Sequence, residues 1–213
     1  MTAPPACMPL AECRDCPRLA SFLDDVRQRF PTYHAGPVDA FGDPRASLLI
    51  VGLAPGMHGA NRTGRPFTGD FAGRLLYDTL HRFGFADRPE SLAYNDGLTL
   101  RDCRITNAVK CLPPENKPQP DEIRMCNRHL AGELAAATDL RILLALGQVA
   151  HKAVLMALGI KQSSCVFSHG ARHPLPNGQI LFDSYHCSRY NTQTRRLTTE
   201  GFHDVFRALR REI

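Results

Sequence analysis

The stretch Ser47-Leu48-Leu49-Ile50-Val51-Gly52-Leu53 is a short apolar run that is closed by glycine and proline. Its length and its ending predict a buried β-strand. Apolar runs of the same kind predict three further strands, at residues 103–109, 141–146 and 179–184. Apolar residues at helical spacing predict helices beside these strands, at residues 17–30, 71–83, 120–137, 147–158 and 199–211.

This alternation of strands and helices predicts an α/β fold, a three-layer α/β/α sandwich with a central, mainly parallel four-stranded sheet. The strands are almost continuously apolar, as expected when helices cover both faces of a sheet. Neither an internal repeat nor a low-complexity linker divides the 213 residues, so we expect one domain over residues 1–213. Ligands of such sheets bind at the carboxyl ends of the strands, which draws attention to the loops after Leu53, Val109 and Ser184.

Composition narrows the class of protein. The sequence has no run of about 18 apolar residues, and its first residues lack the basic-then-apolar pattern of a signal peptide. We therefore expect a cytoplasmic protein without membrane contact, whose cysteines serve as ligands or free thiols. The net charge is +5, with arginines gathered at residues 61–74 and 186–196. Such clusters suit phosphate contacts, although a solvated basic surface explains them about as well.

Four cysteines form two distant pairs. Cys13 and Cys16 stand in a C-x-x-C sequence, whereas Cys111 and Cys126 bracket a proline-rich loop. Thiolates from two such segments can converge on one iron–sulfur cluster or on one zinc ion. Either group would tie the start of the chain to its middle.

The loop over residues 52–70 is rich in glycine, which allows its backbone to approach a ligand closely. Gly59 and Gly64 have the spacing of a phosphate-binding P-loop, but Arg65-Pro66 stands where Lys and Ser or Thr are required. Hydrolysis of nucleoside triphosphates is therefore excluded. Phe67 lies between two glycine turns, which favours a platform for base stacking over its alternative, a core aromatic residue.

The loop over residues 184–196 places His186 directly after a predicted buried strand. A single histidine at such a position is usually structural. Here its neighbours are small polar residues and arginines, which favours a functional site.

Together these segments resemble the uracil-DNA glycosylases of the iron–sulfur branch, most closely family 5, the type-b enzymes. The matching residues are 52–56, 61–70, 110–118 and 184–194, and the resemblance extends from Cys13 to about Thr198. It implies a monofunctional DNA-repair hydrolase that flips uracil, and other deaminated or damaged bases, out of DNA. The enzyme would then hydrolyse the N-glycosidic bond and leave an abasic site. We expect double-stranded DNA as its partner and a monomeric enzyme.

The resemblance also implies a structural [4Fe-4S] cluster on Cys13, Cys16, Cys111 and Cys126, although zinc would fit the sequence pattern alone. The other cysteines are then spare thiols, namely Cys7, Cys103, Cys165 and Cys187. Spacing does not exclude Cys7 as a rival ligand.

Roles in the reaction follow from the same resemblance. Asp70 stabilises the sugar cation or orients water, His186 donates a hydrogen bond to the uracil O2, and Asn116 is a third catalytic residue. Substrate-binding positions are Gly52, Ala54, Gly56, Phe67 and Asn107. Phe67 stacks on the base, and the amide of Asn107 can pair with the N3–H and O4 of uracil.

A further set of residues is expected to contact DNA through phosphates or the gap left in the base stack. Its members are Asn61, Arg62, Arg65, Ser188, Arg189, Tyr190, Arg195 and Arg196.

Two alternatives stay open. An enzyme of the family 4 kind, strict for uracil, is favoured by Asn107. A non-catalytic iron–sulfur protein that only binds DNA is disfavoured by Asp70 and His186. The preferred lesion, the strand preference and the effect of Cys187 beside the motif histidine are not given by the sequence.

Overall fold

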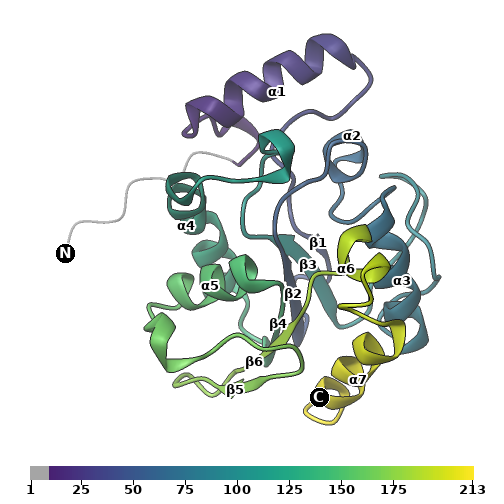
Figure 1. Ribbon diagram of the computed structural model, residues 1–213, viewed down its shortest axis with the longest axis vertical. Helices are drawn as coiled ribbons and strands as arrows, with labels where there is room; N and C mark the ends of the chain where they lie inside the picture. The colour runs from purple at the N-terminus through teal and green to yellow at the C-terminus, as the bar shows by residue number, and fades with distance from the viewer. Residues whose placement is uncertain (1–9) are drawn as a thin grey trace.

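The computed structural model describes residues 10–213, so Cys7 lies outside the described residues. Its centre is a six-stranded sheet with the order β1-β3-β2-β4-β6-β5 (Figure 1). The strands are β1 (Phe41–Gly42), β2 (Leu48–Gly52), β3 (Cys103–Asn107), β4 (Ile142–Leu146), β5 (Arg172–Pro174) and β6 (Ile180–Ser184).

The helices are α1 (Pro17–Arg29), α2 (Ala60–Thr63), α3 (Phe71–Arg82), α4 (Pro120–Ala136), α5 (Gln148–Ala157), α6 (Arg189–Gln193) and α7 (Thr199–Arg210). Short 3₁₀ turns lie at Leu10–Glu12, Pro114–Asn116 and Gln162–Ser164. Within residues 10–213, none of the helices combines the length and the apolar character needed to cross a membrane.

The three-layer prediction is confirmed by how β2 buries its side chains. Leu48 and Ile50 pack into a core shared with α3 and α7, whereas Leu49 and Val51 pack into a second core shared with α4 and α5. Both faces of the sheet are therefore covered by helices, which explains why the central strands are apolar at every position.

The predicted number of four strands is wrong, because the sheet has six. The four predicted strands form its parallel centre, in the order β3-β2-β4-β6. The additional β1 and β5 pair antiparallel at the two edges. They are two and three residues long, too short for an alternating or apolar pattern to reveal them.

The register brings the carboxyl ends of the central strands to one edge. Gly52 at the end of β2 pairs with Asn107 at the end of β3, and Leu146 of β4 pairs with Ser184 of β6. The loops that follow these strands therefore start side by side.

Helix α1 lies beyond the edge of the sheet at which the central strands end, and it is next to the turn that precedes α4 (Figure 1). Its Arg18 makes an ion pair with Glu122 of α4, with an N–O distance of 2.7 Å. The Arg18 guanidinium also donates to the carbonyl of Lys117. These contacts hold the N-terminal segment against the start of α4.

Candidate active site

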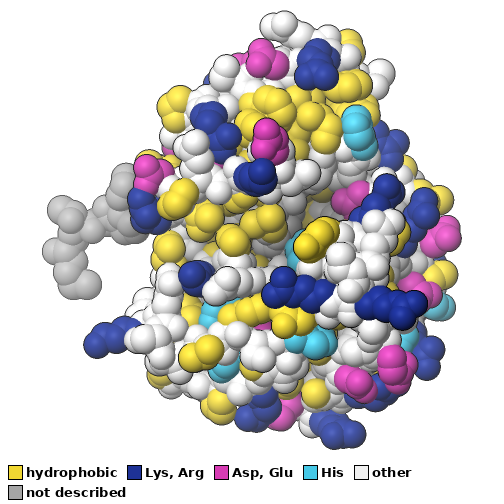
Figure 2. Space-filling view, in the orientation of Figure 1, with side chains coloured by type: hydrophobic (Ala, Val, Ile, Leu, Met, Phe, Trp, Pro, Cys, Tyr) yellow, Lys and Arg dark blue, Asp and Glu magenta, His cyan; other side chains and the backbone are white. Residues whose placement is uncertain are grey.

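A cavity of about 450 Å³ lies at the carboxyl ends of the central strands. Figure 2 shows this face of the molecule, where hydrophobic side chains and Lys and Arg side chains surround a hollow. Nine of the predicted site residues line the cavity. They are Ala54, Gly56, Phe67, Asp70, Asn107, Asn116, His186, Ser188 and Arg189.

Asp70 is the N-cap of α3, where one carboxylate oxygen accepts a hydrogen bond from the Gly73 N–H at 2.8 Å. Its other oxygen packs so closely over Gly59 that a Cβ there would collide with it. Burial raises the pKa of Asp70, and the backbone hydrogen bonds of Gly73 and Ala72 offset this only in part. The result is a fixed carboxylate at the wall of a poorly solvated cavity.

His186 follows β6, and its backbone carbonyl accepts a hydrogen bond from the Asn191 amide at 2.8 Å. Its ring stacks on Phe67, with 5.8 Å between the ring centroids. Burial lowers the pKa of His186 to about 4. The imidazole is therefore neutral near pH 7, and one of its ring nitrogens carries a hydrogen that can be donated to a ligand.

Phe67 forms the floor of the cavity and also belongs to the hydrophobic core on the α3 side. Its backbone is left-handed, with φ of 53°, a costly conformation for a bulky residue. Tyr77 supports this turn by donating to the Pro66 carbonyl at 2.9 Å. Phe67 is therefore a core residue that also reaches the cavity, and its stacking on a base stays a prediction.

Gly52 lies behind this floor rather than at the cavity surface. A Cβ at Gly52 would come within 2.6 Å of the Phe67 ring and would collide with the side-chain oxygen of Asn107. The glycine is needed so that Phe67 and Asn107 can approach the strand end. Its effect on the cavity is thus indirect.

Two asparagines face the cavity from the loops around β3. Asn107 is buried at the end of the strand, and its amide makes no hydrogen bond to any described residue. Asn116 lies at the rim, in a left-handed conformation that directly follows a second one at Glu115, with φ values of 56° and 55°. Two successive strained residues hold this turn in an unusual shape, which is typical of functional sites.

The comparisons with known proteins agree with this geometry. The family model described as the uracil DNA glycosylase superfamily matches residues 40–210. The chain belongs to this superfamily. A type-5 uracil-DNA glycosylase of Thermus thermophilus is 48% identical over 95% of this chain and 94% of its own length.

A second type-5 relative, from Pyrobaculum aerophilum, is 40% identical over 93% of this chain and 88% of its own length. The predicted resemblance to family 5 is therefore confirmed. A type-4 uracil-DNA glycosylase of Sulfurisphaera tokodaii is only 28% identical, over 81% of this chain and 74% of its own length. The type-4 alternative is thus not favoured.

Two residues of this family motif were expected to contact DNA but are buried. Arg65 is only 4% exposed, and its guanidinium donates to Asp96 at 2.7 Å and to Ser91 at 3.1 Å. It also lies 4.3 Å from the centroid of the Phe41 ring. Asn61 is completely buried. Neither side chain is exposed at the surface, and the DNA contacts of Arg65 and Asn61 stay predictions from the sequence.

The other predicted DNA contacts lie at the surface or at the cavity. Ser188 is half-buried and caps α6. The remaining side chains are exposed, namely Arg62, Arg189, Tyr190, Arg195 and Arg196. Four of these five lie in or directly after α6, beside the cavity.

The four predicted ligand cysteines, Cys13, Cys16, Cys111 and Cys126, line one small cavity of about 20 Å³. None of them forms a disulfide. The Lys110 N–H donates to the Cys126 sulfur at 3.2 Å, and the Arg128 guanidinium donates to the Cys13 sulfur at 3.8 Å. Donors directed at sulfur are what thiolate ligands require.

The environment of these thiols bears on their use as ligands. Four cysteine sulfurs are a donor set that either an iron–sulfur cluster or a zinc ion can use. Burial raises the pKa of Cys16 to about 11 and of Cys111 to about 12. Cys126 is buried and the other three thiols are half-buried, so the four sulfurs share one partly protected site.

Sequence reasoning missed the start of α5. Leu146, Gly147, Gln148 and Val149 all line the cavity. The Gly147 N–H donates to the Ser184 carbonyl at 2.8 Å, which closes the ends of β4 and β6 together. The rule that ligands bind at the carboxyl ends of parallel strands applies to β4 as well. This loop was overlooked because its residues carry no distinctive chemistry.

Proposed function

We propose that this chain excises uracil from DNA by flipping the deoxyuridine into the cavity and hydrolysing its N-glycosidic bond. The observation that carries the proposal is the pairing of Asp70 and His186 at one cavity above the Phe67 ring. A carboxylate, a neutral donor and an aromatic floor are the three kinds of group that this reaction uses. The type-5 relatives carry the name of the same activity.

The reaction separates charge. As the bond between C1′ and the base breaks, positive charge grows on the sugar and negative charge grows on the uracil. The Asp70 carboxylate stabilises the sugar cation or holds the attacking water, which gives its hydroxyl to C1′. The neutral imidazole of His186 donates to O2 of the departing uracil, whose N1 takes the remaining proton. Both groups act on charges that are absent from the ground state.

The other cavity residues position the base. Phe67 stacks on it, and Asn107 uses its unpaired amide to bind the N3–H and O4 edge. Ala54 and Gly56 allow close approach of the backbone, and Asn116 completes the catalytic set at the rim. We further propose release of other deaminated or damaged bases, because the cavity exceeds what a single pyrimidine needs.

Double-stranded DNA is the proposed substrate. The exposed Arg189, Arg195 and Arg196 would contact phosphates, and the exposed Tyr190 would fill the gap left by the flipped nucleotide. A single domain over residues 1–213, a monomeric state and a cytoplasmic location stay predictions from the sequence.

A structural [4Fe-4S] cluster is proposed for Cys13, Cys16, Cys111 and Cys126. Its support is the small cavity that all four cysteines line and the N–H donors directed at the sulfurs of Cys126 and Cys13. When bound, the cluster would add iron–thiolate bonds between the N-terminal segment and α4. Hydrolysis of an N-glycosidic bond transfers no electrons, so its role is to hold the fold.

Metal analysis tests the cluster. Purified protein should contain about four iron atoms and four sulfides per chain and absorb broadly near 400 nm. Cys126→Ser should lose the iron, whereas the matched variant Cys187→Ser should keep it. Colourless protein with one zinc ion per chain would contradict the proposal.

The activity is tested with duplexes that carry uracil, hypoxanthine or ethenocytosine. Release of free base and alkali-labile abasic sites is expected from uracil, and Asp70→Asn should prevent both. DNA binding without base release would leave only a binding protein. Release from uracil alone would indicate the strict specificity expected of the type-4 alternative.

A further inference from the structure

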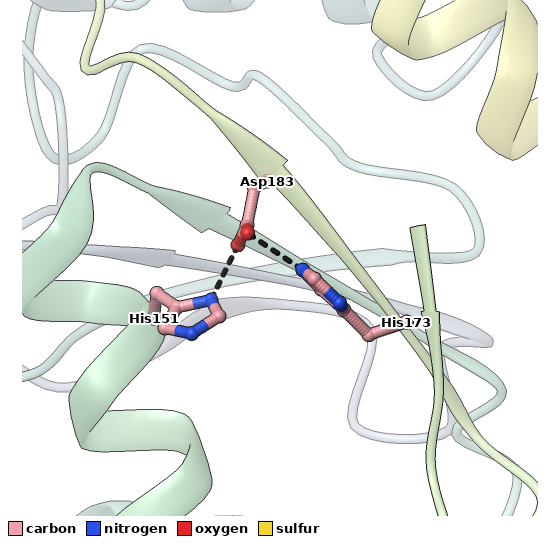
Figure 3. A group of neighbouring side chains, drawn as sticks. All are labelled: His151, His173 and Asp183. Carbon is pink, nitrogen blue, oxygen red and sulfur yellow. Dashed lines mark hydrogen bonds and ion pairs between the residues drawn. The ribbon is translucent and has the colours of Figure 1, made fainter. Parts of the chain in front are cut away.

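Three titratable side chains outside the cavity form one buried group (Figure 3). Asp183 of β6 is completely buried and His151 of α5 nearly so, whereas His173 of the edge strand β5 is partly exposed. Nδ1 of His151 lies 2.7 Å from Oδ1 of Asp183, and Nε2 of His173 lies 2.9 Å from Oδ2. The mechanism described above uses none of these groups.

The hydrogen bonds of His151 fix its protonation. Its Nε2 lies 3.0 Å from the carbonyl of Cys165, which can only accept, so Nε2 carries a hydrogen. Its Nδ1 faces the Asp183 carboxylate at hydrogen-bond distance. A second proton must therefore lie between Nδ1 and Oδ1. Without it, two lone pairs would meet at 2.7 Å.

The surroundings agree with this extra proton. Burial is the largest single influence on His151 and opposes its charge, but the hydrogen bond and the negative charge of Asp183, together with the Cys165 carbonyl, outweigh it, so the pKa of His151 is raised. Lys152 on the same helix acts in the opposite direction, and His173 of β5 faces Asp183 rather than His151. The amide of Asn127 in α4 binds α5 at the Ala153 carbonyl and adds no charge.

The same three residue types occur in metal sites, but two features favour protons here. Both nitrogen–oxygen separations have hydrogen-bond lengths, and each oxygen of Asp183 serves a different histidine. Each oxygen of Asp183 thus already accepts a hydrogen from one of the two histidines, which leaves no lone pair among them directed at a metal ion.

This group joins the two segments that form one wall of the cavity. His151 lies one turn after Gln148, and its N–H donates to the Gly147 carbonyl at 3.1 Å. Asp183 directly precedes Ser184, whose carbonyl accepts from the Gly147 N–H. A Cβ at Gly147 would lie 3.6 Å from the Cβ of His186. A shift between α5 and β6 would therefore displace both Gln148 and His186.

We propose that His151, sharing a proton with Asp183, is a positioning residue for base excision that locks the start of α5 to the end of β6. The inference rests on the proposed function, because its consequence is the placement of His186 against the base. The lock holds while the shared proton is present and weakens as rising pH removes it.

Two variants separate geometry from charge. His151→Phe removes the lock, and we expect the single-turnover rate of uracil release to fall about 10- to 100-fold, the usual effect of a small misplacement. Asp183→Asn keeps the hydrogen bonds without the extra proton, since its amide can donate to a neutral Nδ1 and accept from His173. The ratio of the wild-type rate to the Asp183→Asn rate should fall as the pH rises from about 7 to about 10.

The ratio cancels any titration of the substrate, which is common to both enzymes. His81→Phe is the matched control. His81 is an exposed histidine of α3 whose ring is hydrogen-bonded to the Ala86 carbonyl, beyond the end of the helix, and the ratio of this variant to wild type should not change with pH. A pH-independent ratio for Asp183→Asn, or His151→Phe at the wild-type rate, would overturn the proposal. So would one zinc ion per chain that His173→Gln abolishes.

These experiments distinguish a failure of the proposed function from a failure of the positioning role of His151. If wild-type protein releases no uracil, the proposed function fails. If it does so and the ratio is flat, only this inference fails. Should His151→Phe not fold, the Asp183→Asn ratio still decides.

Discussion

The loop after β2 and the loop after β6 both bring a catalytic candidate to the cavity, but they are built in opposite ways. The first is braced by a distant segment of the chain, through the ion pair of Arg65 with Asp96 and the 2.7 Å contact between the Thr68 and Ser91 hydroxyls. The second carries Arg195 and Arg196 at the surface, where the described structure gives neither an acidic partner.

The difference shows that the arginines of the two loops have different roles. Arg65 stabilises the loop that holds Asp70, because its buried guanidinium is paired with the half-buried carboxylate of Asp96. Arg195 and Arg196 keep their charge available, and Arg196 only stacks over the Tyr185 ring at 4.5 Å. The loop after β2 is thus suited to holding the Asp70 carboxylate in place, and the loop after β6 is suited to binding the phosphates of DNA.

The largest effect should come from the carboxylate that the braced loop holds. Asp70→Ala is expected to lower the single-turnover rate about 100- to 1,000-fold, because the carboxylate acts on charge that appears in the transition state. DNA affinity should change little, which equilibrium binding would check. Asp78→Ala, at an exposed position of the same helix, is the control. Near wild-type turnover by Asp70→Ala would reject the role.

The contacts that brace the loop after β2 should contribute to the free energy of unfolding. Arg65→Ala leaves the half-buried Asp96 and the buried Ser91 without their partner, and a polar group left unsatisfied in this way costs about 1–3 kcal/mol. Denaturant unfolding of the variant should show this loss, whereas Arg62→Ala should stay within about 0.5 kcal/mol of wild type. Equal stabilities for the two variants would mean that the loops do not differ as described.

Asp70 should also make activity and stability respond to pH in opposite directions. Its folded pKa is raised by burial, so the folded state takes up a proton more readily than the unfolded chain. Acidification through this pKa therefore stabilises the fold at this residue while it removes the carboxylate that the reaction needs. Asp70→Asn should be inactive, yet at pH 7 more resistant to urea than wild type. A less stable Asp70→Asn would contradict the argument.

The sequence predicted the parts of the fold that depend on local pattern. Residues 48–52 and 142–146 form buried strands because apolar runs closed by glycine have few other solutions. The edge strand β5 escaped prediction, since three residues at an exposed edge carry no pattern. Site residues with reactive side chains, such as Asp70, were predicted from the sequence. Gly147 was missed, because it contributes through a backbone hydrogen bond to Ser184, which only the folded chain brings close.

Arg65 is a residue whose role the sequence could not reveal, although its position in a motif drew attention to it. Its partner Asp96 lies 31 residues further along the chain, in a segment without motif character. Only tertiary structure brings the two together, so the sequence could not distinguish a brace from a phosphate contact. Arg195 and Arg196 were predicted by the same reasoning, and their exposure leaves that interpretation in force.

The smallest effect is expected in the open loop, and it concerns binding rather than catalysis. Each phosphate contact adds about 0.9 to the slope of log affinity against log salt, because it releases condensed counterions. Replacing both Arg195 and Arg196 by alanine should therefore make the slope shallower by about two. The loss of affinity should be the same for uracil-containing and undamaged duplex, because phosphates carry no sequence information. Arg211→Ala, at the far end of α7, serves as the matched exposed arginine and should leave the slope unchanged. An unaltered slope in the double variant would show that the open loop does not meet DNA, and the contrast between the two loops would then be one of stability alone.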